Sequence, residues 1–277
     1  MWLLVGGACV VATLMLIARE SGWQQTLQWT TIFIWWMPTH LQAVTGQVAW
    51  VLMLLVALAW AAGRRDRQIA CGGLLGAAIA IKPFLAPMLL WLGWRGATRA
   101  VVAACASAAA IVGLGLAGFG LGQYVEWTHG VSLVSWYGMP FNASMWGWSY
   151  RLLAGDPASL ASVMHSGTIA YGIAAALCAC AAAVTAVGLT RLRTFDDQWN
   201  LVLTTTLLVS PLGWVYYGAL LLPGWRGRWP GWLATACWLV PTPWLSAGQP
   251  SIVATLLWGS AASWGLLLIW FRALRAS

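Results

Sequence analysis

Lys82 stands alone among apolar residues near the middle of segment 69–94, directly before Pro83. A charge inside such a segment is costly and by default indicates a functional site. Proline removes a backbone donor and disfavours helix at the preceding residue, so Lys82 should lie at a fixed break. We predict that its ammonium group meets a lipid phosphate; the alternative is a lysine that snorkels from a half-helix end.

A second group of polar side chains lies in segment 123–167, interleaved with aromatic residues. Aromatic rings beside polar groups suit a sugar site, because an apolar sugar face can lie on a ring. For any single tryptophan, the alternative is an interfacial aromatic belt. The candidate binding residues in the densest part of this segment are Asn142, Ser144, Trp146 and Arg151.

The charged residues of this segment allow more than one chemistry. Arg151 can bind a phosphate or pair with Asp156 as an ordinary loop ion pair, and the sequence leaves both open. Glu126 and His129 are one helical turn apart, which suits an acid–base or metal pair, although a solvated loop entrance is the alternative. The sequence has no nucleotide- or metal-binding motif, and its six cysteines lie in apolar runs without a zinc spacing. We therefore expect no metal ion and no cofactor.

The composition identifies the environment in which these residues work. Of the 277 residues, 61% are hydrophobic and only 7% are charged, whereas a soluble domain carries about 25% charged residues. So few charges cannot cover the surface of a soluble protein of this size. This excludes a soluble enzyme and a nucleic-acid-binding domain, and predicts an all-α polytopic membrane protein.

About seven apolar windows are long enough to cross a bilayer as helices. We expect residues 1–277 to form one integral membrane domain. Two further apolar segments, 69–94 and 199–224, are interrupted by Lys82-Pro83 and Ser210-Pro211. We expect each of these to be a proline-broken hairpin of two half-helices. The predicted full spans are 2–18, 27–45, 47–63, 100–122, 168–190, 229–246 and 251–271.

The distribution of arginines supports the hairpins. If both broken segments return to the side they came from, twelve arginines lie on one side and only Arg151 on the other. If both are full spans, the basic residues outside the membrane divide nine against four, which the positive-inside rule disfavours. The preferred topology places the N-terminus, the outer loop 123–167 and the hairpin tips with Lys82 and Ser210 outside.

Several short motifs, taken in order, resemble one known family. The resemblance covers roughly residues 30–225 and lies with glycosyltransferase family 87, polyprenyl-phosphate-dependent mannosyltransferase-like proteins of bacteria in the wider GT-C superfamily. The motifs are Gly46-Gln47, Arg64-Arg65-Asp66-Arg67, Gly76-Ala-Ala-Ile-Ala-Ile-Lys82-Pro83, Pro87-Met-Leu-Leu-Trp, Asn142-Ala-Ser144 with Arg151 downstream, and Leu208-Val-Ser210-Pro211-Leu-Gly-Trp214.

The resemblance implies a multi-span enzyme with its active face on the outer side of the bacterial plasma membrane. The donor would be a polyprenyl-phosphate sugar, the acceptor a glycolipid or cell-envelope glycan, and membrane lipids would surround both. Lys82 and Arg151 would serve the donor phosphate, and Gln47, Asn142 and Ser144 would line the same pocket. A carboxylate would act as general base on the acceptor hydroxyl.

The chain also departs from the family pattern. The catalytic acid of GT-C enzymes lies in the first outer loop, and we expect this chain to lack that span and loop. Glu126, the only glutamate of the outer loop, is then the candidate substitute base. Two alternatives to an enzyme remain: a non-catalytic membrane subunit that binds lipid-linked sugars, and a transporter or flippase of such lipids.

Overall fold

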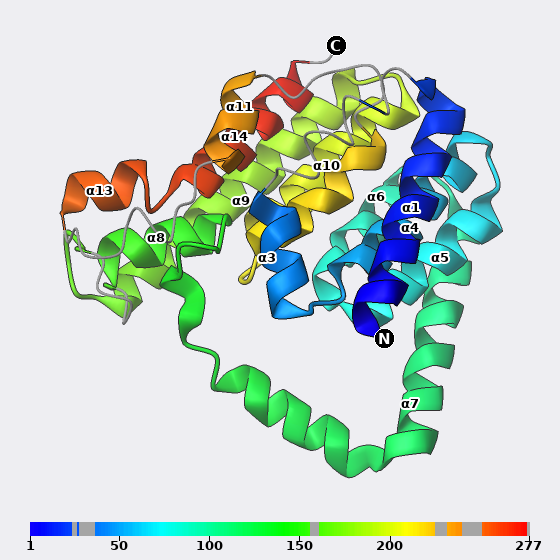
Figure 1. The fold of residues 1–277 in the computed structure, drawn as a ribbon, viewed down its shortest axis with the longest axis horizontal. Coiled ribbons are helices and arrows are strands. Elements are labelled where there is room, and N and C mark those ends of the chain that lie inside the picture. The colour runs from blue at the N-terminus through cyan, green and yellow to red at the C-terminus, as the bar shows by residue number, and fades with distance from the viewer. Residues whose placement is uncertain (24–26, 28–36, 156–160, 225–231, 240–250, 276–277) are drawn as a thin grey trace.

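A computed structural model describes residues 1–23, 27, 37–155, 161–224, 232–239 and 251–275, and the described part contains helices and no strand (Figure 1). The predicted all-α class is therefore confirmed. The helices are α1 (Trp2–Ser21), α3 (Met37–Thr45), α4 (Ala49–Arg64), α5 (Gln68–Ile81), η1 (Pro83–Leu85), α6 (Pro87–Trp94), α7 (Thr98–Ser132), η2 (Trp136–Gly138), α8 (Met145–Leu153), α9 (Gly167–Arg191), α10 (Phe195–Val209), η3 (Val215–Gly224), α11 (Trp232–Leu239), α13 (Ile252–Leu257) and α14 (Ala261–Leu274).

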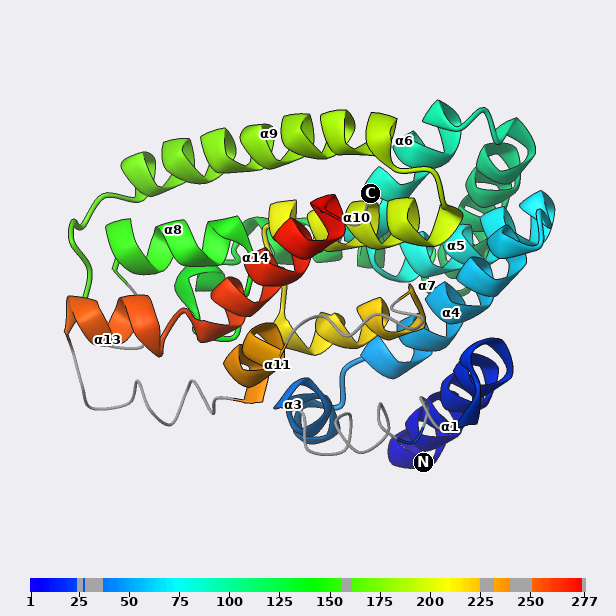
Figure 2. The same cartoon turned by 90° about the horizontal axis from the view of Figure 1, so that it is seen from above.

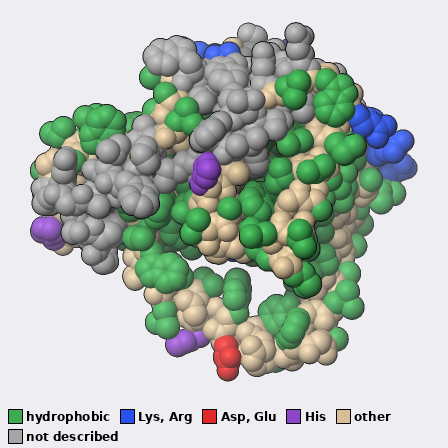
Figure 3. All heavy atoms as spheres, viewed as in Figure 1, with side chains coloured by type: hydrophobic (Ala, Val, Ile, Leu, Met, Phe, Trp, Pro, Cys, Tyr) green, Lys and Arg blue, Asp and Glu red, His purple; other side chains and the backbone are tan. Residues whose placement is uncertain are grey.

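The surface of the bundle shows that the protein belongs in a membrane. Large apolar side chains such as Leu4, Val102 and Leu114 are exposed along α1 and α7, and hydrophobic side chains cover much of the described surface in Figure 3. Monomeric soluble proteins rarely expose apolar patches of this extent. In the described part, three helices are long and apolar enough to cross a bilayer: Trp2–Glu20, Thr98–Val131 and Gly167–Arg191.

The predicted count of seven full spans is not confirmed. Windows 27–45 and 229–246 lie partly outside the described residues. Window 47–63 corresponds to α4, which has 16 residues. Window 251–271 is two helices, because the chain turns at Trp258–Ser260, where the Ser260 hydroxyl donates to the Thr255 carbonyl oxygen at 2.9 Å.

The centre of the bundle is formed by α4 and α10. Trp60 of α4 and Trp199 of α10 are fully buried, and η3 packs against both helices. Helix α10 is buried along most of its length although it contains three consecutive threonines. Their hydroxyls donate to carbonyl oxygens four residues earlier, for example Thr205 to Leu201 at 2.7 Å, so none of these three hydroxyls is left unsatisfied.

Both predicted breaks occur at the prolines. Helix α5 ends at Ile81 before Pro83, and α6 then runs back towards the start of α5. This direction is shown by Leu92 near the end of α6, which lines the same cavity as Gln68 at the start of α5. Helix α10 ends before Pro211, and η3 runs back from that turn beside α4 (Figure 2). The chain therefore forms two hairpins, as the arginine distribution predicted.

Segment 123–167 differs from the predicted outer loop. Helix α7 continues to Ser132 and is broken only at Gly120, whose φ of 79° and ψ of 162° are non-helical. Beyond this break the second half of α7 crosses below the bundle towards α8 (Figure 1). The Tyr124 hydroxyl donates to the Val112 carbonyl oxygen at 3.2 Å, which holds the two halves at an angle. Much of the segment is thus helical.

Helices α5 and α7 run in parallel at close range. A Cβ on Gly72 would lie 1.9 Å from the Ala100 carbonyl oxygen, and one on Gly76 would lie 2.1 Å from that of Ala104. Small residues at such a seam allow two membrane helices to approach backbone to backbone. This pairing fixes where α7 leaves the bundle.

The two ends of the bundle differ in charge. At one end, α4, α6, α9 and α14 finish and α5, α7 and α10 begin; we call this the basic end. Figure 3 shows Lys and Arg side chains gathered at one edge of the visible face. The described arginines at the basic end are Arg19, Arg64, Arg65, Arg67, Arg95, Arg99, Arg191, Arg193, Arg272 and Arg275. Arg226 and Arg228 lie outside the described residues.

Candidate functional site

The opposite end of the bundle is formed by turns, and two of them are joined. The Ala143 amide donates to the Gly213 carbonyl oxygen at 2.8 Å, and the Val215 amide donates to the Phe141 carbonyl oxygen at 2.8 Å. We call residues 139–144 and 210–214 the turn pair. The motifs Asn142-Ala-Ser144 and Ser210-Pro211, far apart in sequence, therefore meet. Ser210 is 5% exposed within this contact.

Asn142 holds the turn pair together. Its side chain is fully buried, and its Nδ2 donates to the Tyr137 carbonyl oxygen at 3.0 Å and to the Pro211 carbonyl oxygen at 2.8 Å. Its Oδ1 accepts from the Ser144 amide at 3.2 Å and from the Ser144 hydroxyl at 2.8 Å. Ser144 in turn caps α8, because its Oγ accepts from the Gly147 amide at 3.2 Å. Both predicted binding residues thus shape the turn.

Arg151 has a position that the sequence did not suggest. Its side chain is fully buried, and its Nη1 donates to the carbonyl oxygens of Met139 at 2.8 Å and Asn142 at 2.9 Å. Its Nε donates to Ser260 Oγ at 3.2 Å, and its Nη2 donates to Ser263 Oγ at 2.7 Å. The guanidinium therefore fastens the turn pair to the start of α14, which differs from the predicted outer-loop phosphate ligand.

An aromatic cluster borders the turn pair. The indole nitrogen of Trp146 donates to the Val209 carbonyl oxygen at 3.1 Å, which fixes the ring at the end of α10. Ring centroids lie 5.1 Å apart for Trp146 and Tyr171, and 5.1 Å apart for Tyr137 and Tyr150. Trp146 itself is half-buried.

Lys82 and Gln47 lie at the same end of the bundle as the turn pair. Lys82 is half-buried at the end of α5, with its amide bonded to the Ala78 carbonyl oxygen at 2.9 Å, and no ion pair joins it to a described residue. The Phe84 ring lies 4.6 Å from that of Tyr217, so the tip of the first hairpin packs against η3. Gln47 is half-buried just before α4, and its carbonyl oxygen accepts from the Gln42 side chain.

Glu126 and His129 are not part of this arrangement. Both side chains are exposed on the second half of α7, beyond the Gly120 break. Within the part of the chain that the structure describes, no group of three His, Cys, Asp or Glu residues is arranged to hold a metal ion. Asp156, the alternative partner of Arg151, lies outside the described residues.

Sequence reasoning missed the serines that bind Arg151. Ser260 and Ser263 occur in an apolar window that reads as one span, and neither belongs to a motif. The signal that was present is Gly259-Ser260, a helix-breaking pair inside that window. A broken helix together with an isolated arginine elsewhere in the chain is a pattern that can be searched for.

The fold and its apolar surface define a helical integral membrane protein with a polar turn region at one end. Comparison with family models identifies the family: the chain belongs to Glycosyltransferase family 87, whose model matches residues 1–211. The family resemblance seen in the motifs is thereby confirmed. No curated protein and no solved structure matches the chain. Membership indicates a membrane glycosyltransferase that uses a sugar donor and an acceptor.

Proposed function

We propose that the protein transfers a hexosyl group, a mannosyl group in the first instance, from a polyprenyl-phosphate sugar to a glycolipid or cell-envelope glycan. The reaction takes place at the end of the bundle that carries the turn pair, which faces outward from a bacterial plasma membrane as in GT-C enzymes. The observation that carries this proposal is the meeting of the two motif turns beside Trp146, at the end opposite the basic end.

The residues divide into those that shape this end and those available to substrate. Asn142, Ser144 and Arg151 have side chains directed at the protein itself, so they position the turn pair. Lys82 and Trp146 are half-buried at the rim. In the proposed complex the Lys82 ammonium binds the donor phosphate, and the Trp146 ring receives the sugar face. Gln47 and Ser210 complete the polar lining.

The positive-inside rule supports the orientation. Ten described arginines lie at the basic end, and cytoplasmic loops carry an excess of Lys and Arg. The turn pair then lies on the outer side, where envelope glycans are assembled. A polyprenyl-phosphate donor suits this location, because its phosphate can lie at the interface while its tail remains in the bilayer.

The test is transfer by the purified full chain in lipid nanodiscs, with radiolabelled polyprenyl-phosphate mannose and membrane glycolipids. We expect Lys82→Gln to raise KM for the donor about tenfold, which corresponds to about 1.4 kcal/mol for one lost charge-assisted contact. Arg272→Gln, which removes an exposed cation at the basic end, should leave KM unchanged. Equal KM values for wild type and Lys82→Gln would refute the assignment of Lys82.

The same assay separates the enzyme from its alternatives. Donor binding without any glycosidic product would indicate a binding subunit, and movement of labelled lipid across the bilayer without a new bond would indicate a flippase. Glu126→Gln tests the proposed substitute base. If Glu126 is that base, the variant loses transfer and keeps donor binding, whereas undiminished turnover would eliminate Glu126 from the mechanism.

A further inference from the structure

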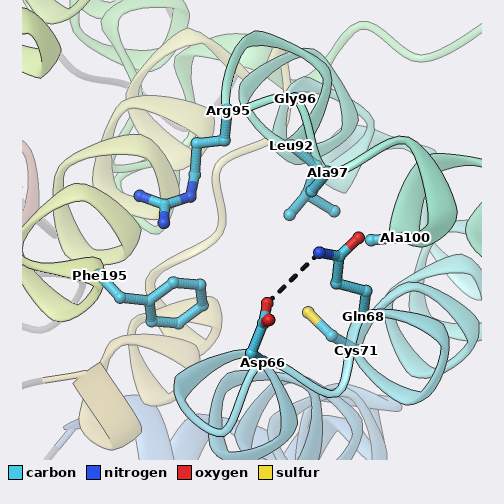
Figure 4. Close-up of a pocket in the computed structure, with 10 residues that line it drawn as sticks. Asp66, Gln68, Cys71, Leu92, Arg95, Gly96, Ala97, Ala100 and Phe195 are labelled. Carbon is cyan, nitrogen blue, oxygen red and sulfur yellow. Dashed lines mark hydrogen bonds between the residues drawn. The ribbon is translucent and has the colours of Figure 1, made fainter.

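A separate cavity of about 140 Å³ lies at the basic end of the bundle (Figure 4). It is bounded by the start of α5, the end of α6, the start of α7 and the start of α10, with Phe195 on the α10 side. Fifteen residues of α10, about 22 Å of helix, separate Phe195 from the turn pair. Nothing in the proposed transferase reaction uses this cavity.

Arg95 supplies a fixed cation to this cavity. Its Nη1 donates to Gln198 Oε1, and its guanidinium carbon lies 5.5 Å from the Trp91 ring centroid and 5.4 Å from that of Phe195. Gln198 is itself held, because its Nε2 donates to the Leu192 carbonyl oxygen at 2.8 Å. No described residue accepts from Arg95 Nε or Nη2, so two donor groups remain for a ligand.

Two arginines near the cavity, Arg64 and Arg65, are engaged in ion pairs. Arg64 pairs with Glu20 at 2.5 Å and with Asp196 at 3.3 Å, and Arg65 also pairs with Glu20. Arg95 has no ion pair with a described residue. The cavity therefore faces a cation that the protein orients and does not neutralise.

The opposite wall of the cavity carries a carboxylate. Asp66 has a φ of 53°, and one of its oxygens accepts from Gln68 Nε2 at 3.3 Å, the bond drawn in Figure 4. Figure 4 shows Arg95 and Asp66 on different sides of the space that Leu92 and Phe195 also border. No ion pair joins Asp66 to a described residue. A ligand with one anionic and one cationic group complements the charges of both walls.

The mouth of the cavity lies beside lipid-facing residues. Ile69 follows Gln68 and is 68% exposed, and Trp94 precedes Arg95 and is 55% exposed. Tryptophan at such a position is typical of the membrane–water interface. Exposed apolar residues beside the lining suit a site at the depth where phospholipid head groups meet acyl chains.

We propose that this cavity binds the phosphoethanolamine head group of a membrane phospholipid, with the phosphate on Arg95 and the primary ammonium on Asp66. A purely anionic head group, such as that of phosphatidylglycerol, can offer hydroxyl donors to Asp66 but brings no positive charge to its carboxylate. A phosphocholine head group has no N–H to donate. The charge pair in the cavity therefore selects phosphatidylethanolamine over phosphatidylglycerol and phosphatidylcholine.

The experiment measures thermal stabilisation of the full chain in detergent as each of these three lipids, with identical acyl chains, is added. A ligand that binds the folded state raises Tm with its concentration, which yields an apparent Kd. We expect phosphatidylethanolamine to bind at least tenfold more tightly than the other two. Arg95→Gln should raise its apparent Kd at least tenfold, whereas Arg191→Gln, an exposed arginine at the same end, should have no effect.

Asp66→Asn is the decisive variant. Asparagine tolerates positive φ, so the backbone at this position is preserved, and only the charge is lost. This variant should bind phosphatidylethanolamine less tightly and phosphatidylglycerol more tightly. It tests the proposed lipid preference even if Arg95→Gln fails to fold. Unchanged lipid preference in Asp66→Asn would overturn the proposal. Equal stabilisation by soluble phosphoethanolamine would also overturn it, because the ligand would then be a free small molecule.

Discussion

Arg151→Lys keeps the positive charge and removes the planar group that reaches two parts of the protein. In the structure the guanidinium bonds two carbonyl oxygens of the turn pair on one side and two serine hydroxyls near the start of α14 on the other. A lysine has three donors on one nitrogen and can serve only one of these sides. The substitution therefore costs about two hydrogen bonds.

The size of the effect follows from those bonds. Hydrogen bonds to charged groups contribute about 1.5–3 kcal/mol each in soluble proteins, and polar contacts within membranes average about 0.6 kcal/mol and reach about 1.7 kcal/mol. Two lost bonds at the upper membrane value give a decrease of about 3 kcal/mol in the free energy of unfolding. The measurement is equilibrium unfolding in mixed micelles, with Arg191→Lys as the control on an exposed arginine.

The same variant distinguishes two roles for Arg151. If the guanidinium positions the turn pair, stability and transfer decline together, and Ser263→Ala lowers stability less in the Arg151→Lys background than in wild type. If Arg151→Lys unfolds like wild type but has lost donor binding, the side chain acts on substrate. That result would refute the reasoning from its buried contacts.

Two further substitutions test packing that the structure makes specific. Gly76→Val places a side chain against the Ala104 carbonyl oxygen, where even a Cβ would lie 2.1 Å away, so α5 and α7 must separate. Unfolding in micelles should show a decrease of at least about 2 kcal/mol in the free energy of unfolding. A smaller decrease would mean that α5 and α7 are not closely packed at this position. Gly213→Ala brings a Cβ within 2.4 Å of the Leu207 carbonyl oxygen and should displace the turn pair, so transfer activity should fall more than tenfold. The control is Gly73→Ala, where a Cβ has no atom within 4 Å, and this variant should retain activity. Equal activities of the two variants would contradict the assigned geometry.

The features predicted well from sequence are those with a local physical cause. Pro83 and Pro211 end helices whatever surrounds them, so both breaks were predictable. The bounds of α1 and α9 follow from continuous apolar runs of sufficient length. The arginine distribution reflects insertion into a membrane, which depends on charge near each span and needs no knowledge of tertiary contacts.

The features predicted poorly depend on partners distant in sequence. Arg151 reads as a loop arginine because its acceptors on α14 are more than a hundred residues away. The break between α13 and α14 is stabilised by the Ser260 hydroxyl. A single serine inside an apolar window does not by itself indicate that the helix ends there. Glu126 lies in a segment that is helical and exposed, and its relation to the turn pair depends on the angle at Gly120. Periodicity contains none of this information.

The two hairpins have an electrostatic consequence for the end that carries the turn pair. Helix α6 begins at this end because the chain reverses at Pro83, and α4 and α8 begin there as well, with Ser144 capping α8. Each helix N-terminus carries roughly half a positive charge from its aligned peptide dipoles. These N-termini contribute a main-chain attraction for an anion that no side-chain substitution removes, and the C-termini of α5 and α10 at the same end oppose part of it. A Lys82→Gln protein should consequently retain measurable affinity for a phosphate, and this remainder marks the contribution of the backbone.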